Sequence, residues 1–551
     1  MQKQTPHLWL WSLALLAGFY LLSLYFKLPL LYIGAPYTTI DDNTLYEAAF
    51  LVWFGEAPPQ RTYVESWLAG ISVLLTYLGH LIGTNQLDQI GLNVVADAYR
   101  LFTEQPDPFV HNYRLLMLAI DLSSAGLVYL LALQLLEQNP RKHWYATLAS
   151  GLFLLSYNSI WCYLVARPDT ATAFFSLIGF ICYYRSEFGK HLLWLIATAI
   201  ALGIATGFKL HAAMAAVFIT LDLWRHHGLR HGLLTMLGFS SLALVTFLVA
   251  TGSTLFDPLL YIKLRALNIK DDASPWIQWG EQIRVVFEGT GWLIIPLLAS
   301  ILWHFRANAA TKIPEKIKSA LFISGLFILV FMSIRQLRAY WMLPALPLFY
   351  VVAVYQLSQF RLKSLQFSIA LLLLGIFSFQ CLQQVKSFED ARYNEMQDWV
   401  KNNVAPDEPI YIIGYDTLFL PCNNECLGHR KYVLERLLQQ ALADDEPFTL
   451  RHIRLWEERA RLKLIDMLNA TSTTGYSYYG FNQTPADILS EQLPVSAWQY
   501  VFIMPNFDRP GVDQLVARIK TEFDYVTRVH APGGKAGTGG LPYDIYKRKL
   551  P

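Results

Sequence analysis

Charged side chains are scarce in this sequence. They account for 16% of its 551 residues, whereas they make up roughly a quarter of an ordinary soluble protein, and hydrophobic residues account for 54%. A surface with so little charge is poorly hydrated, so the composition predicts a protein that crosses a membrane many times. A long basic run is also lacking and the net charge is only +2, which excludes a nucleic-acid-binding function.

Cysteine is rare as well, with five residues in the chain. Cys162, Cys182 and Cys381 lie in hydrophobic segments, where small buried apolar side chains are the ordinary interpretation. Cys422 and Cys426 lie in a polar part of the chain, where we expect a short disulfide loop in an oxidising compartment, with free thiols as the alternative. Two further convincing ligands are lacking, so we predict no metal site there.

A cleavage site with small residues is lacking after the first hydrophobic stretch, which is longer than a signal-peptide core. We therefore expect this stretch to be a retained membrane anchor. Fixed-period repeats and low-complexity tracts are lacking too. Apolar runs predict about eleven membrane spans, near residues 8–33, 113–137, 144–164, 170–184, 192–208, 210–224, 232–253, 290–304, 319–334, 340–356 and 365–382.

A further apolar run at 67–82 contains His80 and follows a polar, proline-containing stretch. If this run spans the membrane, the basic residues of the later short loops face outward. If it does not span, they face the cytoplasm, as the positive-inside rule requires. We therefore predict a juxtamembrane or re-entrant helix, and a C-terminus outside the membrane.

The chain becomes polar after Cys381. Helical patterns near 393–403, 430–443, 451–468 and 512–523 alternate with strand-like runs at 409–415, 500–504 and 543–547. This alternation predicts a small soluble α/β domain. We therefore divide the chain into a membrane domain, 1–385, and an outer domain, 386–551.

Two carboxylates, Asp41 and Asp42, follow the first hydrophobic segment. Asp is a good helix cap, so one interpretation is a capped helix on the membrane surface. Carboxylates at the mouth of a membrane domain are also costly to desolvate, which favours a chemical role. In that second interpretation, a carboxylate accepts the proton of an acceptor hydroxyl, whose oxygen then attacks a sugar that leaves a lipid phosphate.

Four cations, Arg167, Lys209, Arg335 and Arg338, lie at the outer ends of predicted spans, on the same side as the acidic pair. They are either ordinary helix-end residues that snorkel, or the walls of a pocket for an anionic lipid headgroup. Arg335 and Arg338 are three residues apart on one helical face, and two guanidinium groups suit a clamp on a phosphate.

Two of these cations have polar neighbours in tight turns. Asp169 follows Arg167 and a proline, and it either caps the next helix or orients Arg167 and binds sugar hydroxyls. His211 lies two residues after Lys209. We interpret it more simply as a polar residue at a helix end than as a catalytic acid.

Taken in order, these motifs resemble the GT-C superfamily of polytopic glycosyltransferases, in the branch of the protein O-mannosyltransferases and the lipid A aminoarabinose transferases. The resemblance covers most of residues 8–382. It rests on the acidic pair followed by Tyr46, the run that begins at Trp67, the Arg-Pro-Asp turn, the Gly-Phe-Lys turn, and the span that begins Arg-x-x-Arg-Ala-Tyr and continues to Leu-Pro-Ala-Leu-Pro. The outer α/β domain also looks like those appended to such enzymes.

The resemblance implies an inverting transfer of a sugar from a polyprenyl-phosphate donor to an acceptor hydroxyl outside the membrane. It implies an α-helical GT-C membrane domain with outer juxtamembrane helices, in a bacterial inner membrane, with the α/β domain in the periplasm. A glycan, a lipid or a protein could be the acceptor, and the use of a divalent metal stays open.

Roles follow from the same resemblance. Asp41 or Asp42 would be the base, although the family more often has an Asp-Glu pair. The cations Lys209, Arg335 and Arg338 would contact the donor phosphate, and Tyr46, Arg167, Asp169 and His211 would form the pocket. The segment between about residues 85 and 112 is longer than expected, which we interpret as a feature for an unusual acceptor.

Two other classes stay open. A transporter or flippase would use Asp41 and Asp42 to bind a coupling ion, and it predicts charged groups deep within the spans and related half-repeats. Asp121 is the clearest acidic residue of that kind. A receptor or assembly protein displaying the outer domain would not need so many cations at outer helix ends. We favour the enzyme.

Overall fold

The computed structural model spans residues 1–551. It describes residues 7–32, 46, 49–50, 53, 63–86, 94–156, 158–159, 168–251, 275–290, 295, 313–333, 339–360, 362–389, 395–414, 420, 422–443, 475–479, 498–505, 512–531 and 541–549. The chain divides into two compact units. The first unit comprises Met1–Leu31, Thr62–Glu65 and Arg114–Lys386, and the second comprises Tyr32–Arg61, Ser66–Tyr113 and Ser387–Pro551.

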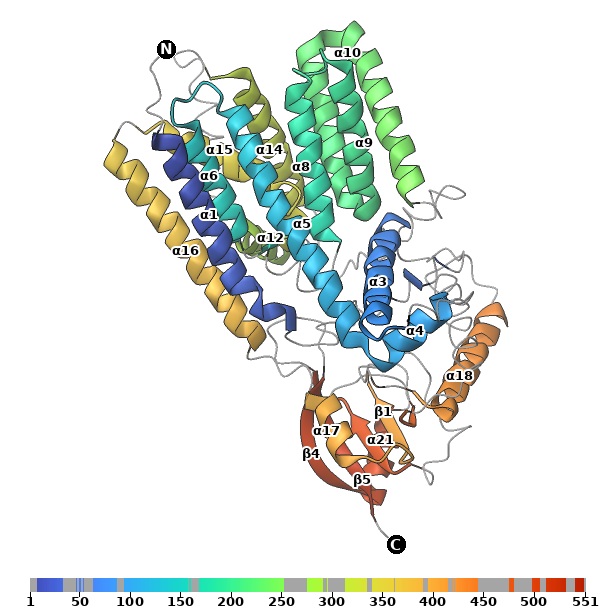
Figure 1. Cartoon of the computed structure of the whole chain (residues 1–551). Coiled ribbons are helices and arrows are strands. Elements are labelled where there is room, and N and C mark those ends of the chain that lie inside the picture. Colours follow the sequence, from blue (N-terminus) through green and yellow to red (C-terminus); the bar gives the residue numbers. More distant parts are fainter. Residues whose placement is uncertain are drawn as a thin grey trace. The chain divides into compact units, whose positions relative to one another are not determined.

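Helices dominate the chain up to residue 389 (Figure 1). They are α1 (His7–Lys27), η1 (Pro29–Tyr32), α3 (Tyr63–Gly83), α4 (Val94–Glu104), α5 (Pro106–Leu135), α6 (Lys142–Leu154), α8 (Asp169–Arg185), α9 (Leu192–Phe208), η3 (Leu210–Ala212), α10 (Ala213–Thr251), α12 (Pro275–Thr290), α14 (Glu315–Ser333), η6 (Ala339–Met342), α15 (Leu346–Ser358) and α16 (Lys363–Glu389). Several of them, such as α1 and α16, are apolar on all sides, which is typical of helices surrounded by lipid or protein.

Helix α10 covers two of the predicted spans, 210–224 and 232–253. The hydroxyl oxygens of Thr220 and Ser240 lie 3.3 Å apart. Twenty residues of straight helix would separate them by about 30 Å. The helix therefore doubles back on itself, and Figure 1 shows its two green segments side by side.

Five helical segments of the described residues are long and apolar enough to cross a membrane: Trp9–Leu31, Ser66–Gly83, Pro106–Leu135, Leu233–Thr251 and Lys363–Lys386. The shorter helices Leu192–Phe208 and Leu346–Ser358 are also apolar. These segments support an integral membrane protein. They do not confirm the predicted total of about eleven spans, and most of the predicted run 290–304 lies outside the described residues. The surface position predicted for 67–82 also stays a prediction, since Ser66–Gly83 is long enough to span.

The C-terminal part of the second unit is an α/β structure. Its helices are α17 (Glu395–Asn403), α18 (Asn424–Ala443) and α21 (Val512–Glu522), and its strands are β1 (Ile410–Ile413), β2 (Tyr478–Tyr479), β3 (Tyr500–Ile503), β4 (Phe523–Ala531) and β5 (Leu541–Arg548). The sheet has the order β2-β1-β3-β5-β4, with β2, β1 and β3 parallel and the last two strands antiparallel. The predicted α/β fold class is confirmed.

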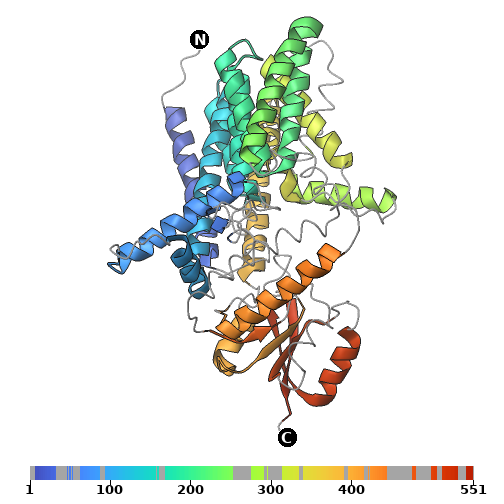
Figure 2. The ribbon, with the colours of Figure 1, turned by 90° about the vertical axis from the view of Figure 1, so that its right-hand side faces the viewer.

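Both faces of the central strands β1 and β3 are covered, because every residue of these two strands is buried. Ile410, Ile412 and Phe502 pack on one face with residues of α17 and α18. Ile413 and Val501 pack on the other face with α21. Figure 2 shows orange α18 and red α21 on opposite sides of the strands. The predicted boundary at 385/386 falls inside α16, and it stays a prediction.

Candidate functional site

Lys209 lies in a tight turn between two helices of the first unit. Helix α9 ends at Phe208, Lys209 has an extended backbone, and η3 begins at the next residue. The Lys209 amide donates to the Ala205 carbonyl at 3.0 Å, and the Lys209 carbonyl accepts from the Ala212 amide at 3.0 Å. The helix therefore ends with Gly-Phe, and the partly exposed Lys209 follows directly after its last turn.

The turn of Lys209 lies beside a second predicted motif. The ring of His211 stacks on Trp341 of η6, with centroids 6.0 Å apart and planes at 17°. Trp341 follows Arg338 by three residues. The structure therefore brings together two motifs that are separated by well over a hundred residues in the sequence. Arg335 and Arg338 themselves lie outside the described residues.

Asp169 is the first residue of α8, as the Arg-Pro-Asp turn predicts, and Pro168 occupies the cap position. Its side chain is completely buried, and among the described residues neither carboxylate oxygen has a hydrogen-bond partner. The start of a helix favours a negative charge. A buried carboxylate nevertheless requires a cation or donors to offset its desolvation.

Asp169 and Lys209 lie at the same end of a helix pair. Helices α8 and α9 are consecutive and antiparallel, so the start of α8 adjoins the end of α9 (Figure 1). The stacked rings of Phe175 and Phe208, 5.7 Å apart, mark this end. One end of the α8–α9 pair thus combines a buried carboxylate with a cation, which is an arrangement suited to a charged, hydroxyl-rich ligand.

Tyr46 is completely buried in the second unit, where its ring contacts those of Phe102 and Tyr113 at 5.2 and 6.0 Å. A buried ring in this setting anchors the chain around it. The acidic pair Asp41 and Asp42 lies outside the described residues, and so does Arg167. Among the described residues, no group of three or more His, Cys, Asp or Glu side chains is placed to hold a metal ion.

Comparisons with known proteins agree with the resemblance seen in the sequence. Residues 104–271, which include Asp169, Lys209 and His211, match the family model described as Dolichyl-phosphate-mannose-protein mannosyltransferase. The crystal structure of ArnT from Cupriavidus metallidurans in the apo state is similar over 96% of this chain and 98% of that one, with a TM-score of 0.50 and 11% sequence identity. The chain has a GT-C fold.

A second crystal structure of the same ArnT, bound to undecaprenyl phosphate, matches with a TM-score of 0.46 and 11% identity, and covers 97% of each chain. No curated protein sequence matches the chain. The GT-C fold and the matching segment support a glycosyltransferase.

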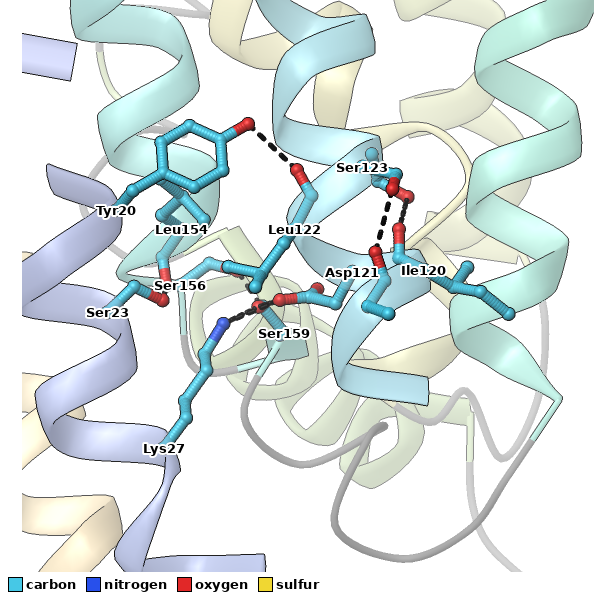
Figure 3. Close-up of polar contacts among 12 residues, drawn as sticks. Tyr20, Ser23, Lys27, Ile120, Asp121, Leu122, Ser123, Leu154, Ser156 and Ser159 are labelled. Carbon is cyan, nitrogen blue, oxygen red and sulfur yellow. Dashed lines mark hydrogen bonds and ion pairs between the residues drawn. The ribbon is translucent and has the colours of Figure 1, made fainter. Parts of the chain in front are cut away.

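The first unit also contains a buried ion pair. Lys27 of α1 and Asp121 of α5 are linked at 2.6 Å, and their side chains are 0% and 1% exposed (Figure 3). Ser159 accepts from Lys27 at 2.6 Å and donates to both Asp121 oxygens at 2.8 and 2.9 Å. Asp121 stands out in the sequence as an acidic residue inside a predicted span, whereas its partner Lys27 was not predicted. The available signal was a lone cation and a lone carboxylate, each inside an apolar run.

This pairing bears on the transporter alternative. A carboxylate that binds a coupling ion must be able to exchange its partner for that ion. The charge of Asp121 is instead balanced by a buried lysine, and Ser159 adds two hydrogen bonds. Asp121 is therefore better explained as a structural link between α1 and α5.

Arg114 is a second buried cation that sequence analysis missed. It is fully buried in α5, and its guanidinium donates to the carbonyl of Leu31 at 3.1 Å. Leu31 lies in η1, ten residues before Asp41. Arg114 thus fixes the end of the helix that leads to the acidic pair.

The outer α/β structure contains a disulfide between Cys422 and Cys426, with Cα atoms 5.5 Å apart. The bridge lies where α18 begins, and the amide of Cys426 donates to the Asn423 side chain at 2.9 Å. Nearby, burial raises the pKa of Tyr479 to about 12, and the charge of Glu425 acts in the same direction. The disulfide, Glu425 and Tyr479 thus belong to the packing between α18 and β2.

Proposed function

We propose that this protein is an inverting glycosyltransferase that moves a sugar from a polyprenyl-phosphate donor to an acceptor hydroxyl outside the membrane. The observation that carries the proposal is the stacking of His211 on Trp341, which joins the Lys209 turn to the segment just after Arg335 and Arg338. Asp169 lies at the same end of the α8–α9 pair as Lys209.

In the proposed reaction, Asp41 or Asp42 accepts the proton of the acceptor hydroxyl. The hydroxyl oxygen forms a bond to the anomeric carbon of the sugar, and the bond from that carbon to the phosphate oxygen breaks. The polyprenyl phosphate leaves with the bonding electrons. Lys209, Arg335 and Arg338 stabilise its negative charge, as preorganised cations do for leaving phosphates.

Asp169, Arg167, Tyr46 and His211 complete the proposed site. Asp169 would accept hydrogen bonds from sugar hydroxyls or offset a neighbouring cation, because its buried carboxylate requires such a partner. His211 would hold the Lys209 turn against Trp341. The enzyme would act in a bacterial inner membrane with its α/β domain in the periplasm.

A test compares two lysines at opposite ends of the same helix pair. Lys209 lies where α9 ends, whereas Lys190 lies between α8 and α9 with its side chain 69% exposed. We expect Lys209→Ala to weaken the binding of undecaprenyl phosphate at least tenfold, since a charge-assisted contact contributes about 1.5–3 kcal/mol. Lys190→Ala should leave the dissociation constant within twofold of the wild-type value. Equal effects of both changes would contradict the proposed phosphate site.

The chemical step is tested in the same preparation with radiolabelled polyprenyl-phosphate sugars and mixed acceptors. Asp41→Asn or Asp42→Asn should abolish sugar transfer while donor binding stays intact, since the base acts only on the acceptor. A folded wild-type protein that binds no polyprenyl phosphate would contradict the proposed function.

A further inference from the structure

The second unit contains a cluster of aromatic rings centred on Phe102 of α4. The ring of Phe102 lies 5.2 Å from Tyr46, 5.6 Å from Phe50, 5.6 Å from Phe109 and 6.4 Å from Tyr99. Phe102 is only 4% exposed. We call these five residues the Phe102 cluster. Aromatic pairs at such distances each contribute about 0.5–1.5 kcal/mol beyond their burial.

The cluster holds the stretch of chain that follows the acidic pair. Tyr46, Ala49 and Phe50 are 0%, 1% and 0% exposed. With Trp53 they recur at the spacing of a single helical face, and all four have helical backbones. Trp53 extends the contact, because its indole nitrogen would lie 2.7 Å from a Cβ atom built on Gly70 of α3. The stretch is therefore fixed between α3, α4 and the start of α5.

We propose that Phe102 of α4 is a positioning residue for the acidic pair. Asp42 precedes Tyr46 by four residues, so the chain that Phe102 fixes begins only four residues after the proposed base. The inference rests on the proposed function. It gives the long segment between residues 85 and 112, which contains α4, a role in placing the base.

Proton transfer depends steeply on the distance between the base and the hydroxyl. A general base acts only within hydrogen-bond reach of the hydroxyl, and a displacement of about 1 Å can cost a hundredfold in rate. Phe102 lies on a separate helix and fixes Tyr46 and Phe50 at once. Removing its ring frees both residues without changing any group that contacts the donor phosphate.

The test uses the full-length protein with Phe102→Leu and Phe102→Ala, and with Phe218→Leu and Phe218→Ala as matched controls. Phe218 of α10 is 5% exposed, and its ring lies 4.7 Å from that of Phe327. The control variants therefore remove a similarly buried ring outside the Phe102 cluster. We expect Phe102→Ala to lower kcat by about ten- to a hundredfold. The dissociation constant for undecaprenyl phosphate should stay within twofold of wild type.

A second readout does not depend on activity. Hydrogen exchange followed by mass spectrometry should show faster exchange of the amides of residues 46–53 in Phe102→Ala than in Phe218→Ala, with the Leu variants in between. Equal exchange of this stretch in the two alanine variants would overturn the inference. So would a loss of kcat that is no greater in Phe102→Ala than in Phe218→Ala.

The two hypotheses fail in different ways. A wild-type protein that binds no polyprenyl phosphate and transfers no sugar contradicts the proposed function and removes the catalytic meaning of Phe102. An active wild type with a Phe102→Ala variant of normal kcat contradicts only the positioning role.

Discussion

At the scale of single residues, the Lys27–Asp121 pair makes the sharpest energetic prediction. Both side chains are buried, so removing one leaves an unpaired charge in an apolar setting. We expect Lys27→Met alone to destabilise the protein by about 3–5 kcal/mol. The double variant Lys27→Met/Asp121→Leu should recover most of that loss, because no charge is then left buried.

The measurement is thermal unfolding of the detergent-solubilised protein for the wild type, both single variants and the double variant. A coupling free energy near zero would show that the two charges are satisfied independently, in contradiction to the structure. Single variants that fail to accumulate, together with a double variant that does accumulate, would instead support the pairing of the two charges.

The sequence indicates such residues by their chemical type, but it does not specify which residues they contact. The Arg-Pro-Asp and Gly-Phe-Lys turns identified Asp169 and Lys209 correctly as residues at helix ends. Lys27 and Asp121 are 94 positions apart in the sequence, and the sequence separation between His211 and Trp341 is larger still. Such pairings depend on how helices pack, which no local pattern specifies.

At the scale of elements, α3 contains two glycines that make opposite predictions. A Cβ atom at Gly70 would approach the Trp53 indole at 2.7 Å, whereas one at Gly79 would have nothing within 4 Å. We expect Gly70→Ala to displace Trp53 and to cost about 1–3 kcal/mol through overpacking. Gly79→Ala should stabilise the helix by up to about 1 kcal/mol, since alanine loses less backbone entropy.

Thermal unfolding and tryptophan fluorescence of both variants provide the check. A fluorescence change should accompany Gly70→Ala and be absent from Gly79→Ala. Identical behaviour of the two variants would show that Trp53 does not pack on this face of α3.

The outer α/β structure shows which elements a sequence can reveal. The strand-like runs at 409–415, 500–504 and 543–547 correspond to β1, β3 and β5. The prediction missed β4, which begins directly where α21 ends and exposes Tyr525 and Val526, so that its pattern is not that of a buried strand. It also missed β2, which is only two residues long and exists through its pairing with β1.

At the scale of the whole molecule, the distribution of basic residues predicts that the turn between α8 and α9 faces the cytoplasm and that the C-terminal part faces outward. Each side offers an exposed position for a cysteine probe. Lys190 is 69% exposed in the turn, and Tyr525 is 57% exposed on β4. A membrane-impermeant maleimide applied to intact spheroplasts should label Tyr525→Cys and spare Lys190→Cys.

After the membrane is permeabilised, both cysteines should react, which controls for their accessibility. The unmodified chain measures labelling of the native cysteines, of which Cys182 and Cys381 are buried and Cys422 and Cys426 are joined. The reverse pattern would place Lys209 and Asp169 on the cytoplasmic side, because they lie at the end of the α8–α9 pair opposite Lys190. Sugar transfer outside the membrane would then be impossible at this site. Labelling of both positions before permeabilisation would require an additional crossing between them, and would decide against the predicted path of the chain.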